Sequence, residues 1–175
     1  MMRVLHMNKV LVMDTSVFCC YLQVPGKETC GNGSDFWDHE RAEAIFKEKT
    51  NQGYYVVLPL ATIIETGNHI AQASGHFKYE VAKNFSSILR KTAQRKTPWA
   101  AFLEPEVLWD DKGLIQLAER FPEDAKHNLS IGDSTIREVA NYHAKTGAAV
   151  EILTADDQLK SFEPQPPPSI PRRRK

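Results

Sequence analysis

The feature that most constrains the fold is the stretch from Lys9 to Phe18, with the sequence KVLVMDTSVF. Four consecutive apolar residues precede the acid, and a short run of this kind predicts a strand that is buried on both faces. Asp14 ends the run, so its carboxylate is expected at the carboxyl end of the strand, where open α/β sheets bind their ligands. Thr15 and Ser16 are favourable helix N-cap residues, so the strand should turn directly into a helix over 15–22.

Further strand and helix signals alternate along the chain. The sequence predicts strands over 54–60 and 150–153, and a short strand around 106–109. Helices are expected from an N-cap at Ser34 to about Thr50, and over 61–73, 77–95, 112–121, 133–145 and about 157–162. The apolar residues of three of them should face the core: Ile63, Ile64, Ile70 and Ala71 in 61–73, Leu114, Ile115, Leu117 and Ala118 in 112–121, and Ile136, Val139, Ala140 and His143 in 133–145. Such alternation indicates an α/β fold, a three-layer α/β/α sandwich with a mostly parallel central sheet of four to five strands.

The length of the chain allows one domain with a substantial core. Its 175 residues are too few for two ordinary domains, and 42% hydrophobic with 25% charged residues is ordinary globular usage. We interpret residues 1–8 as a leader, with Met7 as an alternative start, and 9–162 as the folded domain. Residues 163–175 form a tail that is rich in proline and ends in four consecutive basic residues, and it should be extended or disordered.

The composition also limits the expected location of the protein. No apolar run approaches the roughly 20 residues of a membrane span, and the start of the chain lacks the pattern of a signal peptide. Three cysteines, of which Cys19 and Cys20 are adjacent, suit neither a zinc site nor a disulfide framework. We therefore expect a cytoplasmic protein with no membrane association, in which these two cysteines are buried helix residues.

Four acids are expected to meet at one edge of the sheet: Asp14, Glu65, Asp133 and Asp156. Asp14 and Asp156 each follow an apolar strand directly, and the carboxyl ends of parallel strands share one edge. Each acid also has a simpler explanation, as a helix cap or an exposed helix residue. Together they would repel one another without a cation, and oxygen ligands select a hard ion, Mg²⁺ or Mn²⁺.

At these residues the chain resembles the PIN-domain ribonuclease family. Val-Met-Asp14-Thr15-Ser16-Val is similar to the first motif of that family, and Pro59 through Glu65 to the second. Ser130-Ile131-Gly132-Asp133 is similar to the third motif, and Thr154-Ala155-Asp156 followed by Leu159 to the fourth. The four segments extend over about 9–162, which is nearly the whole chain.

The resemblance implies a PIN-like fold and a Mg²⁺- or Mn²⁺-dependent endoribonuclease that hydrolyses RNA phosphodiester bonds. Asp14, Glu65, Asp133 and Asp156 would be both its metal ligands and its catalytic residues. Many relatives of this size are toxins of bacterial toxin–antitoxin pairs, so an antitoxin or other protein partner and homo-oligomers are implied as well. The long segment 77–109 and the basic tail depart from the pattern of the small toxins.

Several alternatives remain open from the sequence. The main one is a PIN-like binding or regulatory protein with a degenerate site. Asp157 can substitute for Asp156, and His69, four residues after Glu65, pairs with it either at a metal or in a helix-surface hydrogen bond. The basic residues between Lys78 and Lys96 form either a solvated helix face or a surface that faces phosphates.

Overall fold

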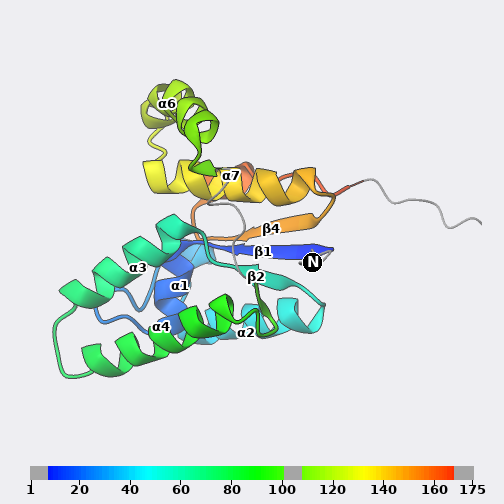
Figure 1. Ribbon diagram of the computed structural model, residues 1–175. Helices are drawn as coiled ribbons and strands as arrows, with labels where there is room; N and C mark the ends of the chain where they lie inside the picture. Colours follow the sequence, from blue (N-terminus) through cyan, green and yellow to red (C-terminus); the bar gives the residue numbers. More distant parts are fainter. Residues whose placement is uncertain (1–7, 101–107, 168–175) are drawn as a thin grey trace, which may run out of the picture.

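The structure is a computed structural model that describes residues 8–100 and 108–167 (Figure 1). Within them, four strands form an all-parallel sheet in the order β3-β2-β1-β4. The strands are β1 (Lys9–Met13), β2 (Tyr55–Val57), β3 (Trp99–Ala100) and β4 (Ala149–Leu153). Strands β1 and β4 pair over their whole length, with Lys9 opposite Ala149 and Met13 opposite Leu153.

Helices cover both faces of the sheet, which confirms the three-layer α/β/α prediction. They are α1 (Thr15–Leu22), α2 (His39–Asn51), α3 (Leu60–Gln72), α4 (Lys78–Ala93), α6 (Asp111–Lys126), α7 (Ile131–Lys145) and α8 (Asp157–Ser161), with a 3-10 turn at Gly33–Asp35. In Figure 1, α1 to α4 lie on one side of the strands, while α7 lies on the other and carries α6 on its outer side.

The central strand β1 contributes to the core on both of its faces. Leu11 and Met13 pack in one cluster with side chains of α1, α2 and α4, among them Phe18 and Phe85. Val10 and Val12 point to the opposite face and pack with α7 and α8. Successive side chains of a strand alternate between faces, so the apolar run of β1 joins the two helical layers through one sheet.

Two helix boundaries differ from the sequence prediction by four residues or more. Helix α2 begins at His39 and not after Ser34, because the carboxylate of Asp38 accepts the Arg41 N–H at 2.9 Å and caps the helix. Helix α6 continues through Pro122 and ends at Lys126. A buried ion pair between Asp124 in its last turn and Arg137 of α7 fixes that turn against the neighbouring helix.

The strand expected around 106–109 can be compared with the structure only at its last two residues. Its residues 106–107 lie outside the described part, and Leu108 and Trp109 take no part in the sheet. The edge strand is instead Trp99–Ala100, which pairs with Val56 and Val57 of β2. Two residues are too few for a periodic pattern, so the hydrogen bonds to β2 define this strand.

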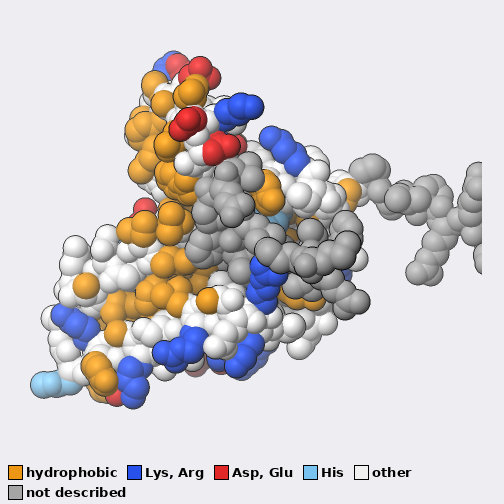
Figure 2. All heavy atoms as spheres, viewed as in Figure 1, with side chains coloured by type: hydrophobic (Ala, Val, Ile, Leu, Met, Phe, Trp, Pro, Cys, Tyr) orange, Lys and Arg blue, Asp and Glu red, His pale blue; other side chains and the backbone are white. Residues whose placement is uncertain are grey.

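Some apolar side chains expected to face the core are exposed. On α3, Ile64 is 53% exposed, whereas the buried face carries Thr62, Thr66 and Ile70. On α6, Leu114 and Ile115 are also exposed, and Figure 2 shows hydrophobic side chains gathered over this helix. The periodicity identified the apolar residues of α6, but within the described residues Leu114 and Ile115 stay exposed.

The remaining findings concern the ends of the chain and membranes. Residues 164–167 are in neither helix nor strand, as expected for the tail, and 168–175 lie outside the described residues. Among the helices of 8–100 and 108–167, none has the length and apolar character needed to cross a membrane.

Candidate active site

All four predicted acids line one cleft of about 760 Å³ at the carboxyl edge of the sheet. Asp14 follows β1 and Asp156 follows β4, which is the arrangement expected for neighbouring parallel strands. Glu65 reaches the cleft from α3 and Asp133 from the first turn of α7. Four segments that are distant in sequence therefore bring carboxylates to the same place.

Asp14 is the most enclosed of the four, with 5% of its surface exposed. Its Oδ1 accepts the Thr15 N–H at 2.6 Å, and its Oδ2 accepts the hydroxyls of Ser16 at 2.6 Å and Thr154 at 2.9 Å. Burial raises the pKa of Asp14 above its ordinary value; these hydrogen bonds oppose the shift, and the charge of Asp133 adds to it. The fold thus places a carboxyl group where burial and the acidic neighbour both disfavour its charged form.

Glu65 occupies a place that only glycine leaves open. Its Oε2 accepts the Thr15 hydroxyl at 2.8 Å, which joins α3 to the start of α1. A Cβ added at Gly132 would lie 2.4 Å from the Glu65 Oε1, well inside van der Waals contact. Gly132 therefore lets the carboxylate of α3 approach the first turn of α7, beside Asp133.

Asp133 forms a capping box at the start of α7, which begins at Ile131 rather than at Asp133 itself. The Ser130 N–H donates to Oδ2 of Asp133 at 3.2 Å, and the Asp133 N–H donates to the Ser130 hydroxyl oxygen at 3.0 Å. This reciprocal pairing satisfies backbone groups that the helix leaves free. The cap orients the Asp133 carboxylate through its Oδ2.

Asp156 caps α8 and connects to Asp14 through Thr154. Its Oδ1 accepts the backbone N–H groups of Gln158 at 2.7 Å and Leu159 at 3.1 Å. The Asp156 N–H donates to the Thr154 hydroxyl at 3.0 Å, and that hydroxyl donates to Asp14. Thr154 thus links the two strand-end acids. The Thr-x-Asp motif placed this threonine near Asp156 but did not predict its hydrogen bond to Asp14.

The loop after α1 supplies a wall of the cleft that the sequence did not reveal. Lys27, Thr29 and Cys30 line the cleft from this loop. His69 and Asp157, the two residues considered as further ligands, line it as well. A polar loop with two glycines has no periodic pattern, so only the folded chain shows where these side chains lie.

The donor set suits a hard cation, although the side chains are not arranged as a finished metal site. Carboxylate and hydroxyl oxygens surround the cleft, and these are the ligands that Mg²⁺ and Mn²⁺ prefer. Within the described residues, no group of three or more His, Cys, Asp or Glu side chains is placed to hold an ion. The caps at Asp133 and Asp156 each engage one carboxylate oxygen, and the pKa of Asp14 is raised chiefly by burial and in smaller part by the charge of Asp133.

Comparison with known proteins adds no relative: no protein-family model, no curated protein and no solved structure matches this chain.

Proposed function

We propose that this chain is a Mg²⁺- or Mn²⁺-dependent endoribonuclease and that the acidic cleft is its active site. The observation that carries the proposal is the convergence of Asp14, Glu65, Asp133 and Asp156 on one cleft at the carboxyl edge of the sheet. The order of the four motifs, which resembles that of PIN-domain ribonucleases, supports it. An oxygen-rich, anionic cleft at a strand edge suits phosphodiester hydrolysis with a divalent ion.

Each acid has a defined place in this proposal. The four carboxylates would hold the ion, which when bound lowers the pKa of a water and offsets charge on the phosphodiester. Thr15, Ser16 and Thr154 hold the Asp14 carboxylate in one orientation through three hydrogen bonds. Such fixed orientation favours catalysis because the reacting groups need little reorganisation.

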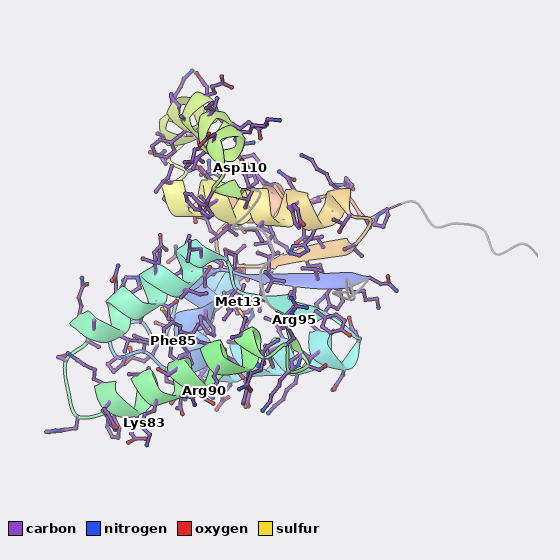
Figure 3. All side chains as sticks on the ribbon, viewed as in Figure 1. Met13, Lys83, Phe85, Arg90, Arg95 and Asp110 are labelled. Atoms are coloured by element: carbon purple, nitrogen blue, oxygen red, sulfur yellow. The ribbon has the colours of Figure 1, made fainter. Side chains whose placement is uncertain are left out.

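The basic residues of α4 support RNA as the substrate. Figure 2 shows Lys and Arg side chains over this helix, and Figure 3 shows Lys83, Arg90 and Arg95 placed along it and just beyond its end. Lys83 pairs with Glu80 at 3.2 Å, an exposed pair of small energetic weight. Cations in such a row can neutralise successive phosphates of a nucleic acid.

The decisive experiment compares Asp14→Asn with the parent in RNA cleavage. The parent should cleave RNA when Mg²⁺ or Mn²⁺ is present and stop when EDTA removes the ion. Asp14→Asn keeps the shape of the side chain and removes its charge, so cleavage should be abolished while the circular dichroism spectrum stays that of the parent. Equal metal-dependent cleavage by both proteins would refute the proposal.

A matched control guards this assay against contaminating nuclease. Asp111 is exposed in the first turn of α6, and it does not line the cleft. Asp111→Asn makes the same chemical change at a distance, so it should retain the parent rate when purified in parallel. If both variants lost cleavage, the loss would come from a difference between the protein preparations and not from the change at Asp14.

A second candidate is a PIN-like binding or regulatory protein with a degenerate site. It is favoured by the finding that no described group of three acidic, His or Cys side chains is placed to hold an ion. Calorimetric titration with Mn²⁺ separates the two candidates. A binding protein would retain RNA without cleaving it, and its titration would show no saturable heat of Mn²⁺ binding. A nuclease would show such a heat in the parent, and Asp14→Asn would abolish it.

The proposal extends to partners and location through the same resemblance. A ribonuclease of this kind would act in the cytoplasm and would be held inactive by an antitoxin-type protein or assemble with a second copy. Induced expression of the parent should then arrest growth, while Asp14→Asn should not. Sedimentation at micromolar concentration reports the oligomeric state. An active monomer that does not arrest growth would count against both the antitoxin-type protein and the second copy.

A further inference from the structure

Two of the three cysteines meet at the wall of the cleft. Cys20 lies on α1, one turn after Ser16, and Cys30 lies in the loop that follows the helix. Their sulfur atoms are 3.3 Å apart, and both thiols are free. Nothing in the spacing of the cysteines had indicated this pairing.

Both cysteines are held in place by their backbones. Cys20 is fully buried in the core cluster beneath α1. Cys30 exchanges two backbone hydrogen bonds with Trp37, at 3.0 Å and 2.8 Å, in an isolated antiparallel bridge. Gly31 follows with a φ of +76°, where an added Cβ would lie 2.0 Å from the Asp35 carbonyl oxygen, so the turn after Cys30 requires glycine. The sulfur pair is therefore a fixed feature of the loop.

The two thiols differ in access and in acidity. Cys30 is half-buried and lines the cleft, so a small solute can reach it, whereas Cys20 lies behind it. A hydrogen bond from the Cys20 thiol, with a further one involving Ser16, lowers the pKa of Cys30 despite burial. The same contact raises the pKa of Cys20. Cys30 is thus the nucleophile of the pair and Cys20 the thiol that responds to it.

We propose that Cys20 and Cys30 form a dithiol oxidation site, in which a peroxide converts the pair into an intramolecular disulfide. The Cys30 sulfur attacks hydrogen peroxide and becomes a sulfenic acid, and one water leaves. The Cys20 sulfur then attacks the sulfenic sulfur, which forms the S–S bond and releases a second water. Two thiols lose two electrons and two protons, and one peroxide is reduced to two waters.

The disulfide would alter one wall of the acidic cleft. It needs the sulfur atoms to approach from 3.3 Å to roughly 2.05 Å, a small movement for a loop. The bond closes the chain between residues 20 and 30, ten positions apart, beside the Ser16 that donates to Asp14. The site is defined by chemistry alone and does not depend on the proposed nuclease activity.

Peptide mapping of the folded full-length chain tests the site. Trypsin cuts after Lys9, Lys27 and Arg41, so Cys20 and Cys30 fall in different peptides, 10–27 and 28–41. After mild treatment with hydrogen peroxide and alkylation of the remaining thiols, the two peptides should appear as one linked species that a reductant separates. Fragmentation of this species in the parent protein should place the link at Cys20 and not at Cys19.

Cys19 supplies the matched control, because it precedes Cys20 on α1 and also lines the cleft, whereas the sulfur that lies 3.3 Å from the Cys30 sulfur is that of Cys20. Cys19→Ser should form the link in the yield of the parent, while Cys20→Ser and Cys30→Ser should lose it. A link to Cys19, disulfides between separate molecules, or oxidation of Cys30 to sulfinic acid without a link would each overturn the proposal. The parent fragmentation decides the matter even if a variant fails to fold.

Discussion

Replacing Gly132 with alanine tests the geometry of the cleft without removing any of its acids. The added Cβ would lie 2.4 Å from Oε1 of Glu65, whereas ordinary van der Waals contact begins at 3.4 Å. The carboxylate must therefore retreat by about 1 Å, a displacement that can cost an enzyme about 10²-fold in rate. Because this oxygen ends a flexible side chain, the backbone can stay where it is.

The effect of Gly132→Ala on stability should be small because two contributions oppose each other. Alanine in a helix is favoured over glycine by up to about 1 kcal/mol. Loss of the hydrogen bond between Thr15 and Glu65, now 2.8 Å, costs about 0.5–1.5 kcal/mol. The free energy of unfolding should therefore stay within about 1 kcal/mol of the parent value.

The assay pairs urea unfolding with metal-dependent RNA cleavage, and Gly67→Ala serves as its control. Gly67 lies on α3, two residues from Glu65, and a Cβ there would meet Phe85 at an ordinary 3.7 Å. The control should be as stable as the parent or more so and should cleave at the parent rate. The reasoning is refuted if Gly132→Ala cleaves like the parent, or if it loses several kcal/mol because Glu65 cannot move.

Three further predictions concern charge. Burial raises the folded-state pKa of Asp14, so Asp14→Asn should increase the free energy of unfolding at pH 7. This gain should vanish below the ordinary Asp pKa of 3.8, because Asp14 is then protonated in both the folded and the unfolded protein. Urea unfolding measured across this pH range tests the prediction. Arg137→Ala removes two hydrogen bonds from the buried carboxylate of Asp124, which then keeps only the Ser134 hydroxyl at 2.9 Å and the longer Arg120 pair at 3.8 Å. Urea unfolding should show a loss of up to about 3–5 kcal/mol for this variant, against less than about 1 kcal/mol for loss of the exposed pair between Lys126 and Glu123. Deletion of 172–175 should flatten the salt dependence of RNA binding, and an unchanged slope would exclude a role of the tail in binding RNA.

Local sequence patterns predicted the elements whose boundaries are encoded locally. The apolar run before Asp14 gave β1, and the polar pair after it, followed by apolar positions, gave α1 with the bounds that the structure has, although the N-cap of α1 is Asp14 and not Thr15 or Ser16. On α7, the inward positions Ile136, Val139, Ala140 and His143 are all buried. In each case the spacing of the apolar residues follows the period of the element, 2.0 residues in a strand or 3.6 in a helix, and neighbouring elements cover these residues.

Where the sequence prediction was wrong, a distant partner decided the outcome. The apolar side of α6 was identified, but periodicity cannot tell whether another element covers that side, and Leu114 and Ile115 are exposed. Pro122 normally ends a helix, yet α6 runs on to the residue pair that joins it to Arg137. These outcomes depend on contacts between helices, which a local window of sequence does not contain.

The same division applies within the cleft. The rule for strand ends predicted that Asp14 and Asp156 gather at one edge, because it depends only on topology, while Glu65 and Asp133 were expected there from the helices next to those strands. It did not predict what holds them, since Thr154 reaches Asp14 across 140 positions and Gly132 makes room for a side chain of α3. Both residues are nevertheless visible in the sequence. Gly132 stands in the first turn of a helix, where glycine lowers helix stability. Thr154 places a hydroxyl group beside a strand-end acid, where it needs a hydrogen-bond partner. A glycine that lowers helix stability next to an acidic residue, as Gly132 does next to Asp133, therefore indicates that a carboxylate from another element, here Glu65, must fit beside it.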